Sequence, residues 1–398
     1  MMDNKDNKWE IIKLTEGSES GDYHSHAYYD IPVFDSQSQL LAGHRVSFKE
    51  RSPEPSDKID IGYIDLQDLQ GDKSWKKVGE STAWSWQQGA MSQWLPQTKT
   101  LIWNDRQDNR FVSRHYCAES GETKTFPHPV YAVAPDGKFF LSLNMARLNY
   151  VRPGYGYAGG AGHLMDSLKP KEDGVWKIDA ETGEQKLLLS LHDAAKFLLS
   201  RLPARLRISN IIRRYVFWFN HVKMSPDGKR FTVKLRFRAR DLSRSWNDSM
   251  GCSLTCGTDG QDLRLLEHAT SHVIWLDNKR LYFWRRDAVY LYEDAPGGGK
   301  KLNKIAPDLI NHNVHMRHFP DNPEHFIFDT PYRETIDLFT YDAADAQQTK
   351  IATFHNHNPK HGEYRCDLHP CPSPDGKSMV VTSMDDGGRQ MYLLKKRA

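Results

Sequence analysis

The sequence predicts an all-β chain that folds as a seven-bladed β-propeller, and two observations support this prediction. First, one short unit recurs seven times: an extended segment, a tight turn such as Pro-Asp-Gly-Lys, and a second apolar segment. Second, further stretches rich in β-branched and aromatic residues follow most units, which makes about four strands in each repeat. Four short strands in each of seven repeats describe the blades of a propeller.

The seven copies differ in how closely they keep the turn. Pro-Asp-Gly favours a tight reversal, because proline presets φ and glycine accepts a positive φ. Full copies span 130–143, 221–235 and 369–383, weaker copies span 91–104, 272–284 and 315–329, and a degenerate copy spans 28–44. The last unit has about three strands, so we expect the N-terminal segment 9–14 to supply its fourth strand and close the ring. A β-sandwich or barrel with similar hairpins is the alternative, which seven in-phase copies disfavour.

We expect one domain over 1–398, interrupted by insertions at about 149–173 and 191–219. The first is rich in Gly and Tyr. The second has Leu-Leu pairs and several arginines, and it predicts a helical insertion between the third and fourth blades. A basic amphipathic helix is typical of a membrane surface or a calmodulin-type target, but a helical cover between two blades is the interpretation that we favour.

Composition excludes several classes of protein. The net charge of +3, from 54 Lys and Arg against 51 Asp and Glu, is too small for a dedicated nucleic-acid binder. No apolar run is long enough to span a membrane. The polar start lacks the apolar centre of a secretory signal, so a cytoplasmic location is expected over a secreted one. Five cysteines, an odd number in a long chain, argue against a disulfide framework.

Aligning the repeats places four histidines in one column, five residues before the turn proline or its equivalent. In a propeller the first strand of each blade lines the central channel, so this column meets at one channel mouth. Four imidazoles there would suit a divalent ion such as zinc or manganese, and Asn313 and Asp367 could complete or orient the site. Structural histidines at blade starts are the alternative. The predicted ligands are His221, His272, His315 and His369.

A second column, at the end of the second strand, is rich in cations. It holds His44, Arg45, Asn104, Asp105, Arg106, Asn144, Arg147, Arg236, Arg238, Arg285, Arg286 and Arg333. A ring of arginines focuses positive potential on one face, and their planar forks suit carboxylates or sulfates. Nearby aromatic residues suit sugar rings, so the predicted partner is an anionic, uronate-containing oligosaccharide or polysaccharide. We predict substrate contacts from Gln87, Gln88, Asn104, Arg106, Arg152, Tyr155, Tyr157 and Arg236.

The reaction open to a uronate chain is β-elimination. The C5 proton leaves, the 4-linked sugar departs, and a cation neutralises the adjacent carboxylate. Tyr131, on the first strand of the third blade, is predicted to transfer the proton, and Arg147, at the end of the second strand, to neutralise the carboxylate. An inter-blade packing role is the alternative for Tyr131.

At these residues the sequence resembles the seven-bladed propeller polysaccharide lyases of the ulvan lyase and oligogalacturonate lyase groups. The resembling segments are 86–96, 103–106, 131–138, 146–148, 152–157 and 365–369. The resemblance implies metal-associated β-elimination, with a Tyr and an Arg on neighbouring strands as catalyst and neutraliser and with channel histidines around the metal ion. Ulvan lyases also use histidines from early blades. The early histidines here are His24, His26, His44 and His128, of which His128 is our catalytic candidate.

Two other functions stay open from the sequence. One is a propeller without catalytic activity that binds an anionic glycan or a protein. The other is a glycoside hydrolase, which needs two carboxylates facing each other across the site. The channel-side columns offer only Asp105, Asp329 and Asp367 for that role. The sequence does not fix the sugar, the linkage or the oligomeric state.

Overall fold

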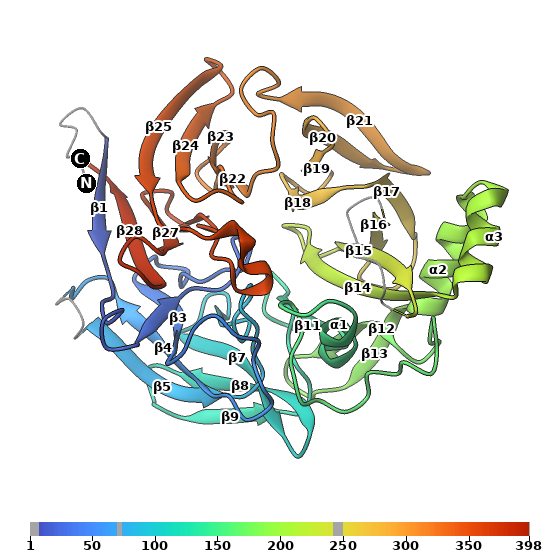
Figure 1. Cartoon of the computed structure of the whole chain (residues 1–398), viewed down its shortest axis with the longest axis horizontal. Coiled ribbons are helices and arrows are strands. Elements are labelled where there is room, and N and C mark those ends of the chain that lie inside the picture. The colour runs from blue at the N-terminus through green and yellow to red at the C-terminus, as the bar shows by residue number, and fades with distance from the viewer. Residues whose placement is uncertain (1–7, 70–73, 242–249, 398) are drawn as a thin grey trace. The chain divides into compact units, whose positions relative to one another are not determined.

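A computed structural model describes residues 8–69, 74–241 and 250–397 of the chain. These residues form a seven-bladed β-propeller built from seven four-stranded sheets (Figure 1). The chain divides into two compact units. The first is made of 1–107, 112–125 and 306–398, and the second of 108–111 and 126–305. Each unit is described by itself below.

The first unit holds almost all residues of four sheets. Within each sheet the strands are antiparallel neighbours, and the turn that the repeat predicts joins the first two. The strands are β2 (Tyr23–Ser25), β3 (Leu40–Val46), β4 (Ile59–Asp65), β5 (Trp75–Ser81); β6 (Gln93–Trp94), β7 (Thr100–Gln107), β8 (Arg110–Cys117), β9 (Thr123–Phe126); β22 (Met316–Phe319), β23 (Asn322–Asp329), β24 (Ile336–Asp342), β25 (Gln347–Phe354); β26 (Cys371–Pro372), β27 (Ser378–Ser383), β28 (Gln390–Lys396) and β1 (Trp9–Lys13). A short 3-10 segment, η2 (Pro359–Tyr364), precedes β26.

The second unit holds three sheets and three helices. The strands are β10 (Ala132–Val133), β11 (Phe139–Ser142), β12 (Gly174–Asp179), β13 (Gln185–Ser190); β14 (Tyr215–Met224), β15 (Arg230–Ala239), β16 (Gly251–Gly257), β17 (Arg264–His268); β18 (Ser271–Trp275), β19 (Arg280–Arg285), β20 (Ala288–Ala295) and β21 (Gly298–Ile305). The helices are α1 (Met145–Val151), α2 (Leu191–Arg201) and α3 (Ala204–Arg213).

The N-terminal strand closes the last sheet as predicted. Strand β1 pairs antiparallel with β28, so that Trp9 faces Lys396 and Lys13 faces Tyr392. The Trp9 ring is buried and stacks on Phe319 of β22, with ring centroids 6.0 Å apart. One aromatic side chain thus joins the closing strand to the core of the neighbouring sheet.

The structure corrects two boundaries from the sequence. The first repeat begins at β2, Tyr23–Ser25, rather than at residue 28, and residues 28–34 run between β2 and β3. The helical insertion ends at 214 rather than 219, because the apolar run 215–219 already belongs to β14, where residues 216–219 are buried. Helix α2 begins at the N-cap Ser190, whose hydroxyl accepts the Asp193 N–H at 3.0 Å.

The structure also bears on two features of the composition, the cysteines and the hydropathy. All five cysteines are free thiols. No helix among the described residues has both the length and the hydropathy that a membrane crossing requires.

We predict that Trp9→Ala lowers the free energy of unfolding by about 3 kcal/mol or more, because it empties a buried aromatic site on the closing strand. Denaturant unfolding followed by circular dichroism measures this change. Glu10→Ala, at an exposed position of the same strand, is the matched control and should change stability by less than about 0.5 kcal/mol. Equal effects of the two substitutions would contradict a closing role for the buried ring.

Candidate metal centre and its surroundings

Three of the four histidines in the predicted column share a backbone conformation with Met91, which holds the equivalent position in an earlier blade, whereas His315 does not have it. Met91, His221, His272 and His369 have φ values of +57°, +53°, +52° and +50°. Left-handed backbone is costly for residues other than glycine and is concentrated at functional sites. His221 and His272 also fall where the pairing register shifts, in β14 and β18. The column is therefore a real structural repeat, and its presence at Met91 shows that the conformation alone does not make a ligand.

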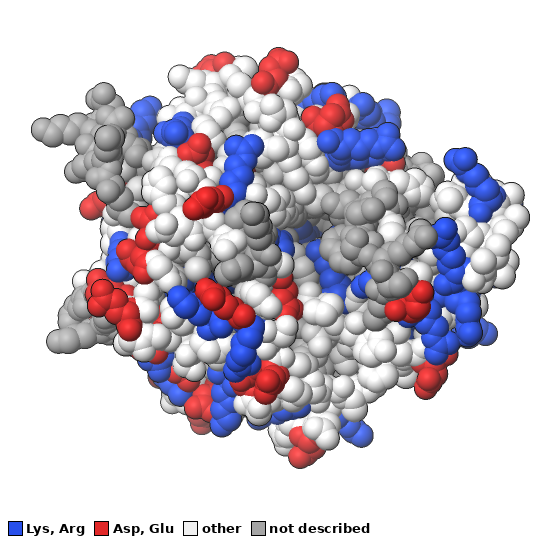
Figure 2. All heavy atoms as spheres, in the orientation of Figure 1, with Lys and Arg blue, Asp and Glu red and all other residues white. Residues whose placement is uncertain are grey.

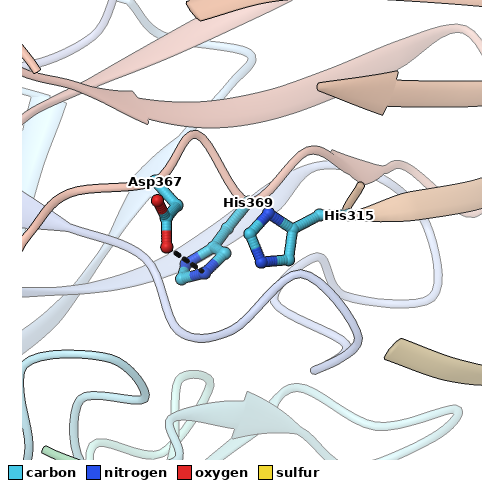
Figure 3. Close-up of side chains that lie close together, drawn as sticks. All are labelled: His315, Asp367 and His369. Carbon is cyan, nitrogen blue, oxygen red and sulfur yellow. Dashed lines mark ion pairs between the residues drawn. The ribbon is translucent and has the colours of Figure 1, made fainter. Parts of the chain in front are cut away.

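Three buried side chains of the first unit converge as a possible metal site (Figure 3). His315, Asp367 and His369 each offer one ligand atom, and these atoms lie within 4.8 Å of one another. His315 immediately precedes β22, and the other two come from the segment before β26. Leu368, between Asp367 and His369, is fully buried in the core.

Asp329, the last residue of β23, fixes the orientation of His315. Its carboxylate accepts the backbone N–H of His315 at 2.9 Å and contacts Nδ1 of the ring at 3.0 and 3.2 Å. An Nδ1–H that donates to a carboxylate leaves the lone pair on Nε2, the nitrogen that a metal ion would use. The pair is completely buried.

The His369 ring is suited to the same task. Its Nε2 is buried without a hydrogen-bond partner and lies 4.0 Å from Asp367 Oδ2. Burial, and then the nearby His315 and His26, lower the pKa of His369 well below its usual value of 6.5. The imidazole is therefore neutral near pH 7. A buried lone pair without a donor beside a carboxylate fits a divalent cation.

The Arg365 guanidinium holds Asp367, the third residue of the cluster, in place. Arg365 Nε donates to Asp367 Oδ2 at 2.9 Å, and the Arg365 guanidinium lies 5.1 Å from the centre of the Tyr332 ring. The sequence shows this group as an alternating Arg-x-Asp-x-His pattern over 365–369. A guanidinium thus lies beside the three candidate ligands and pairs with the carboxylate of one of them.

Aromatic rings that the sequence did not indicate enclose the two imidazoles. The Tyr28 ring lies 4.4 Å from His369, and the Tyr29 ring lies 5.2 Å from His315, measured between centroids. The two imidazoles themselves are 4.7 Å apart in a T-shaped arrangement. Both tyrosines are buried. They follow β2 in an irregular segment, so no strand periodicity pointed to them.

Gln87, a predicted substrate contact, instead braces the backbone that carries the cluster. Its Nε2 donates to the carbonyls of Glu363 and Arg365 at 2.8 and 3.0 Å. Arg389 adds donors to the carbonyls of Tyr364 and Arg365. Because both side chains hold the chain just before Asp367, they position the cluster.

Three other predicted substrate contacts of the first unit are also placed. Gln88 and Asn104 are buried, whereas Arg106 donates to the carbonyl of Pro55. His24, His26 and His44 are buried too, and His26 is held at both ring nitrogens by the His369 carbonyl and the Thr382 hydroxyl. His26 is therefore a structural residue rather than a reactive one.

The second unit brings together four of the predicted residues. The Tyr131 hydroxyl accepts the backbone N–H of His221 at 3.0 Å, and the His221 ring makes a T-shaped contact with Tyr155 at 5.5 Å. The Arg152 guanidinium lies 3.8 Å from the Tyr155 ring centre. Burial, followed by Lys223 and Arg152, lowers the pKa of His221 well below 6.5. A neutral imidazole, a phenol and a guanidinium thus share one neighbourhood.

The remaining predicted residues of this unit lie in other surroundings. Arg236 donates to the Asn220 side chain at 3.2 Å, and Tyr157 packs edge-on against Phe111. His272 is the second residue of β18 and has the left-handed conformation already described. His128 lies between β9 and β10, is partly exposed, and forms no side-chain hydrogen bond with a described residue.

Arg147 does not fit the role of carboxylate neutraliser. Its five N–H groups donate to the carbonyls of Phe217, His163, Leu164, Ser167 and Leu168, which uses the whole donor set of a guanidinium. The side chain is buried. Residues 145–151 form α1 instead of continuing a strand, so Arg147 points into the loop 163–168 rather than to a rim.

Known proteins match this chain through structure. No family model and no curated protein sequence matches it. An oligogalacturonate lyase solved in complex with manganese superposes with a TM-score of 0.63 at 12% identity, covering 98% of this chain and 94% of that chain. An oligogalacturonate lyase from Vibrio parahaemolyticus gives 0.58 at 12% identity, covering 97% and 93%. At these identities the likeness establishes the propeller fold.

We predict that the purified chain binds one Mn²⁺ or Zn²⁺ ion and that Asp329→Asn weakens this binding about 10- to 100-fold, because the carboxylate orients His315. Elemental analysis after equilibrium dialysis measures it. His369→Ala should abolish binding, whereas His355→Ala, an exposed histidine of the same unit, should leave it unchanged. Full metal content in His369→Ala would rule out this ligand set.

Arg147→Ala should destabilise the fold by about 4 kcal/mol or more, because it leaves one buried and several partly buried carbonyls without this donor, at about 1–3 kcal/mol for each group left unsatisfied. Urea unfolding measures this loss against Arg110→Ala, an exposed control. An Arg147→Ala protein of unchanged stability that cannot turn over a uronate substrate would restore the catalytic role.

Proposed function

We propose that this chain is a lyase that cleaves uronate-containing oligosaccharides by β-elimination, with a divalent ion held by His315, His369 and Asp367. The observation that carries the proposal is the buried cluster itself. It offers two imidazole nitrogens and one carboxylate, and neighbouring side chains orient His315 and Asp367. The two superposed structures are oligogalacturonate lyases, one of them in complex with manganese, and this agrees with the proposed chemistry.

The donor set suits manganese or zinc. Imidazole and carboxylate together are common ligands of both ions, and the buried Nε2 of His369 supplies a lone pair that no protein donor uses. When bound, such an ion would neutralise the uronate carboxylate and so make the adjacent C5 proton more acidic. Arg365, beside Asp367, adds positive charge for the same carboxylate.

The chain's own residues would exclude water from the site and transfer the proton. Tyr28 and Tyr29 enclose the imidazoles with buried rings, which lowers the local dielectric and strengthens each charge interaction. For the proton transfer we retain Tyr131, whose phenol carries a donor and an acceptor. His128 stays a second prediction for the same step.

A hydrolase is not favoured by the cluster. Hydrolysis of a glycoside needs one carboxylic acid and one carboxylate that both face the sugar. Asp329 accepts a hydrogen bond from His315, and Asp367 accepts one from Arg365, so each carboxyl group already has a partner.

The decisive assay offers oligogalacturonates, ulvan oligomers and glucuronan oligomers to metal-loaded protein and follows the ultraviolet absorbance of a 4,5-unsaturated uronate. We expect product from at least one of them. His315→Ala and His369→Ala should lower kcat/KM about 100-fold or more, the scale of losing electrostatic stabilisation of the transition state. Removal of the metal by a chelator should have the same effect, and re-addition should restore activity.

His355→Ala is the matched control and should keep the full rate. Tyr131→Phe should remove turnover while keeping metal content. Metal-loaded protein that binds these glycans without forming unsaturated product would make it a glycan-binding propeller rather than a lyase.

A further inference from the structure

Helix α3 of the second unit is turned with its apolar side to the solvent. The side chains of Ile208, Ile211 and Ile212 are 55%, 75% and 74% exposed, and no residue of the helix is buried. Its least exposed members are polar: Ser209, whose hydroxyl lies 3.3 Å from that of Tyr215, and Asn210. The helix thus rests on the protein through its polar side.

This orientation is the reverse of what a cover helix needs. An amphipathic helix at a protein surface buries its apolar stripe, as α2 does with Leu191, Ala194, Ala195 and Leu198. In α3 the spacing of 208, 211 and 212 makes one stripe, and that stripe faces outward. Four of the nine exposed large hydrophobic residues among the described part of the chain lie on α3. Such a concentration marks an interaction surface.

The charge around the stripe has one sign. Arginines stand at 201, 205, 207, 213 and 214, and the sequence has no Asp or Glu from 194 to 226. None of these five arginines forms an ion pair with a described residue. Figure 2 shows Lys and Arg among uncharged side chains at the place that α3 occupies in Figure 1.

We propose that α3 binds the surface of an anionic lipid bilayer. An outward stripe of isoleucines flanked by arginines is the arrangement of helices that lie in the membrane interface, with apolar side chains at the acyl boundary and cations at the phosphates. With 10 residues, α3 lies on a membrane rather than crossing it. This proposal is independent of the lyase chemistry.

Charge complementarity favours the bilayer over two other occupants, a second copy of the chain and an acidic glycan. A second copy of the chain, meeting α3 across a two-fold axis, would bring the arginines against their own equivalents. An acidic glycan would satisfy the arginines but would leave Ile211 and Ile212 in water. A bilayer of acidic phospholipid uses both features at once.

Vesicle co-sedimentation of the full chain tests the proposal. We expect binding to phosphatidylglycerol vesicles, little binding to phosphatidylcholine vesicles, and weakening with added salt. The double variant Ile211→Ser/Ile212→Ser should bind phosphatidylglycerol vesicles at least 10-fold more weakly, and Arg205→Gln/Arg207→Gln should lose the salt-dependent part. Leu302→Ser removes an exposed leucine elsewhere in the same unit and should bind as the unmodified chain does.

Because the substituted side chains are exposed, the thermal transition should be unchanged in all three variants, and this is checked by circular dichroism. No sedimentation with phosphatidylglycerol vesicles would overturn the proposal. So would equal binding by the Ile211→Ser/Ile212→Ser variant. Self-association that this variant abolishes, seen by analytical ultracentrifugation without lipid binding, would assign α3 to a second copy instead.

Discussion

Burial of polar groups away from water governs the candidate centre. Asp329 and Asp367 are almost completely buried, and so are the imidazoles of His315 and His369. Buried carboxylates and imidazoles persist only when each has a partner, because desolvation penalises every unpaired polar atom. Asp329 is paired with His315 and Asp367 with Arg365, while Nε2 of His369 has no hydrogen-bond partner. The cluster therefore presents donor atoms that could hold a metal ion.

Hydrogen bonds from the surrounding chain offset the conformational cost of this arrangement. His369 adopts left-handed backbone, which the structure maintains by holding the residues before it. Gln87 and Arg389 both donate to the Arg365 carbonyl, and the His26 ring contacts the carbonyl of His369 itself. These residues are far apart in the sequence, but their buried polar side chains all gather around one short segment. Their common effect is to keep Asp367 and His369 in one place.

The fold could be predicted from the sequence because three Pro-Asp-Gly turns set the phase of the repeat, and the four weaker copies could then be aligned to it. The same phase located His315 and His369 and pointed to Asp367, since residues two apart on an extended chain share a side. The sequence indicated Asp329 only as a channel-side carboxylate. Its pairing with His315 could not be predicted, because it depends on how the end of one strand packs against the start of another. Arg147 was misplaced for a definite reason. Column alignment assumes a strand, and Asn144 instead caps helix α1 by accepting the Arg147 N–H. The outward face of α3 could not be predicted either, because periodicity reveals a stripe but not the direction in which it points.

The most direct test of the account is anomalous diffraction at the manganese absorption edge, from crystals grown with Mn²⁺. The account predicts a strong anomalous peak within coordination distance of Nε2 of His315 and His369 and of an Asp367 carboxylate oxygen. A metal peak located elsewhere, with these three side chains bonded only to protein, would contradict it.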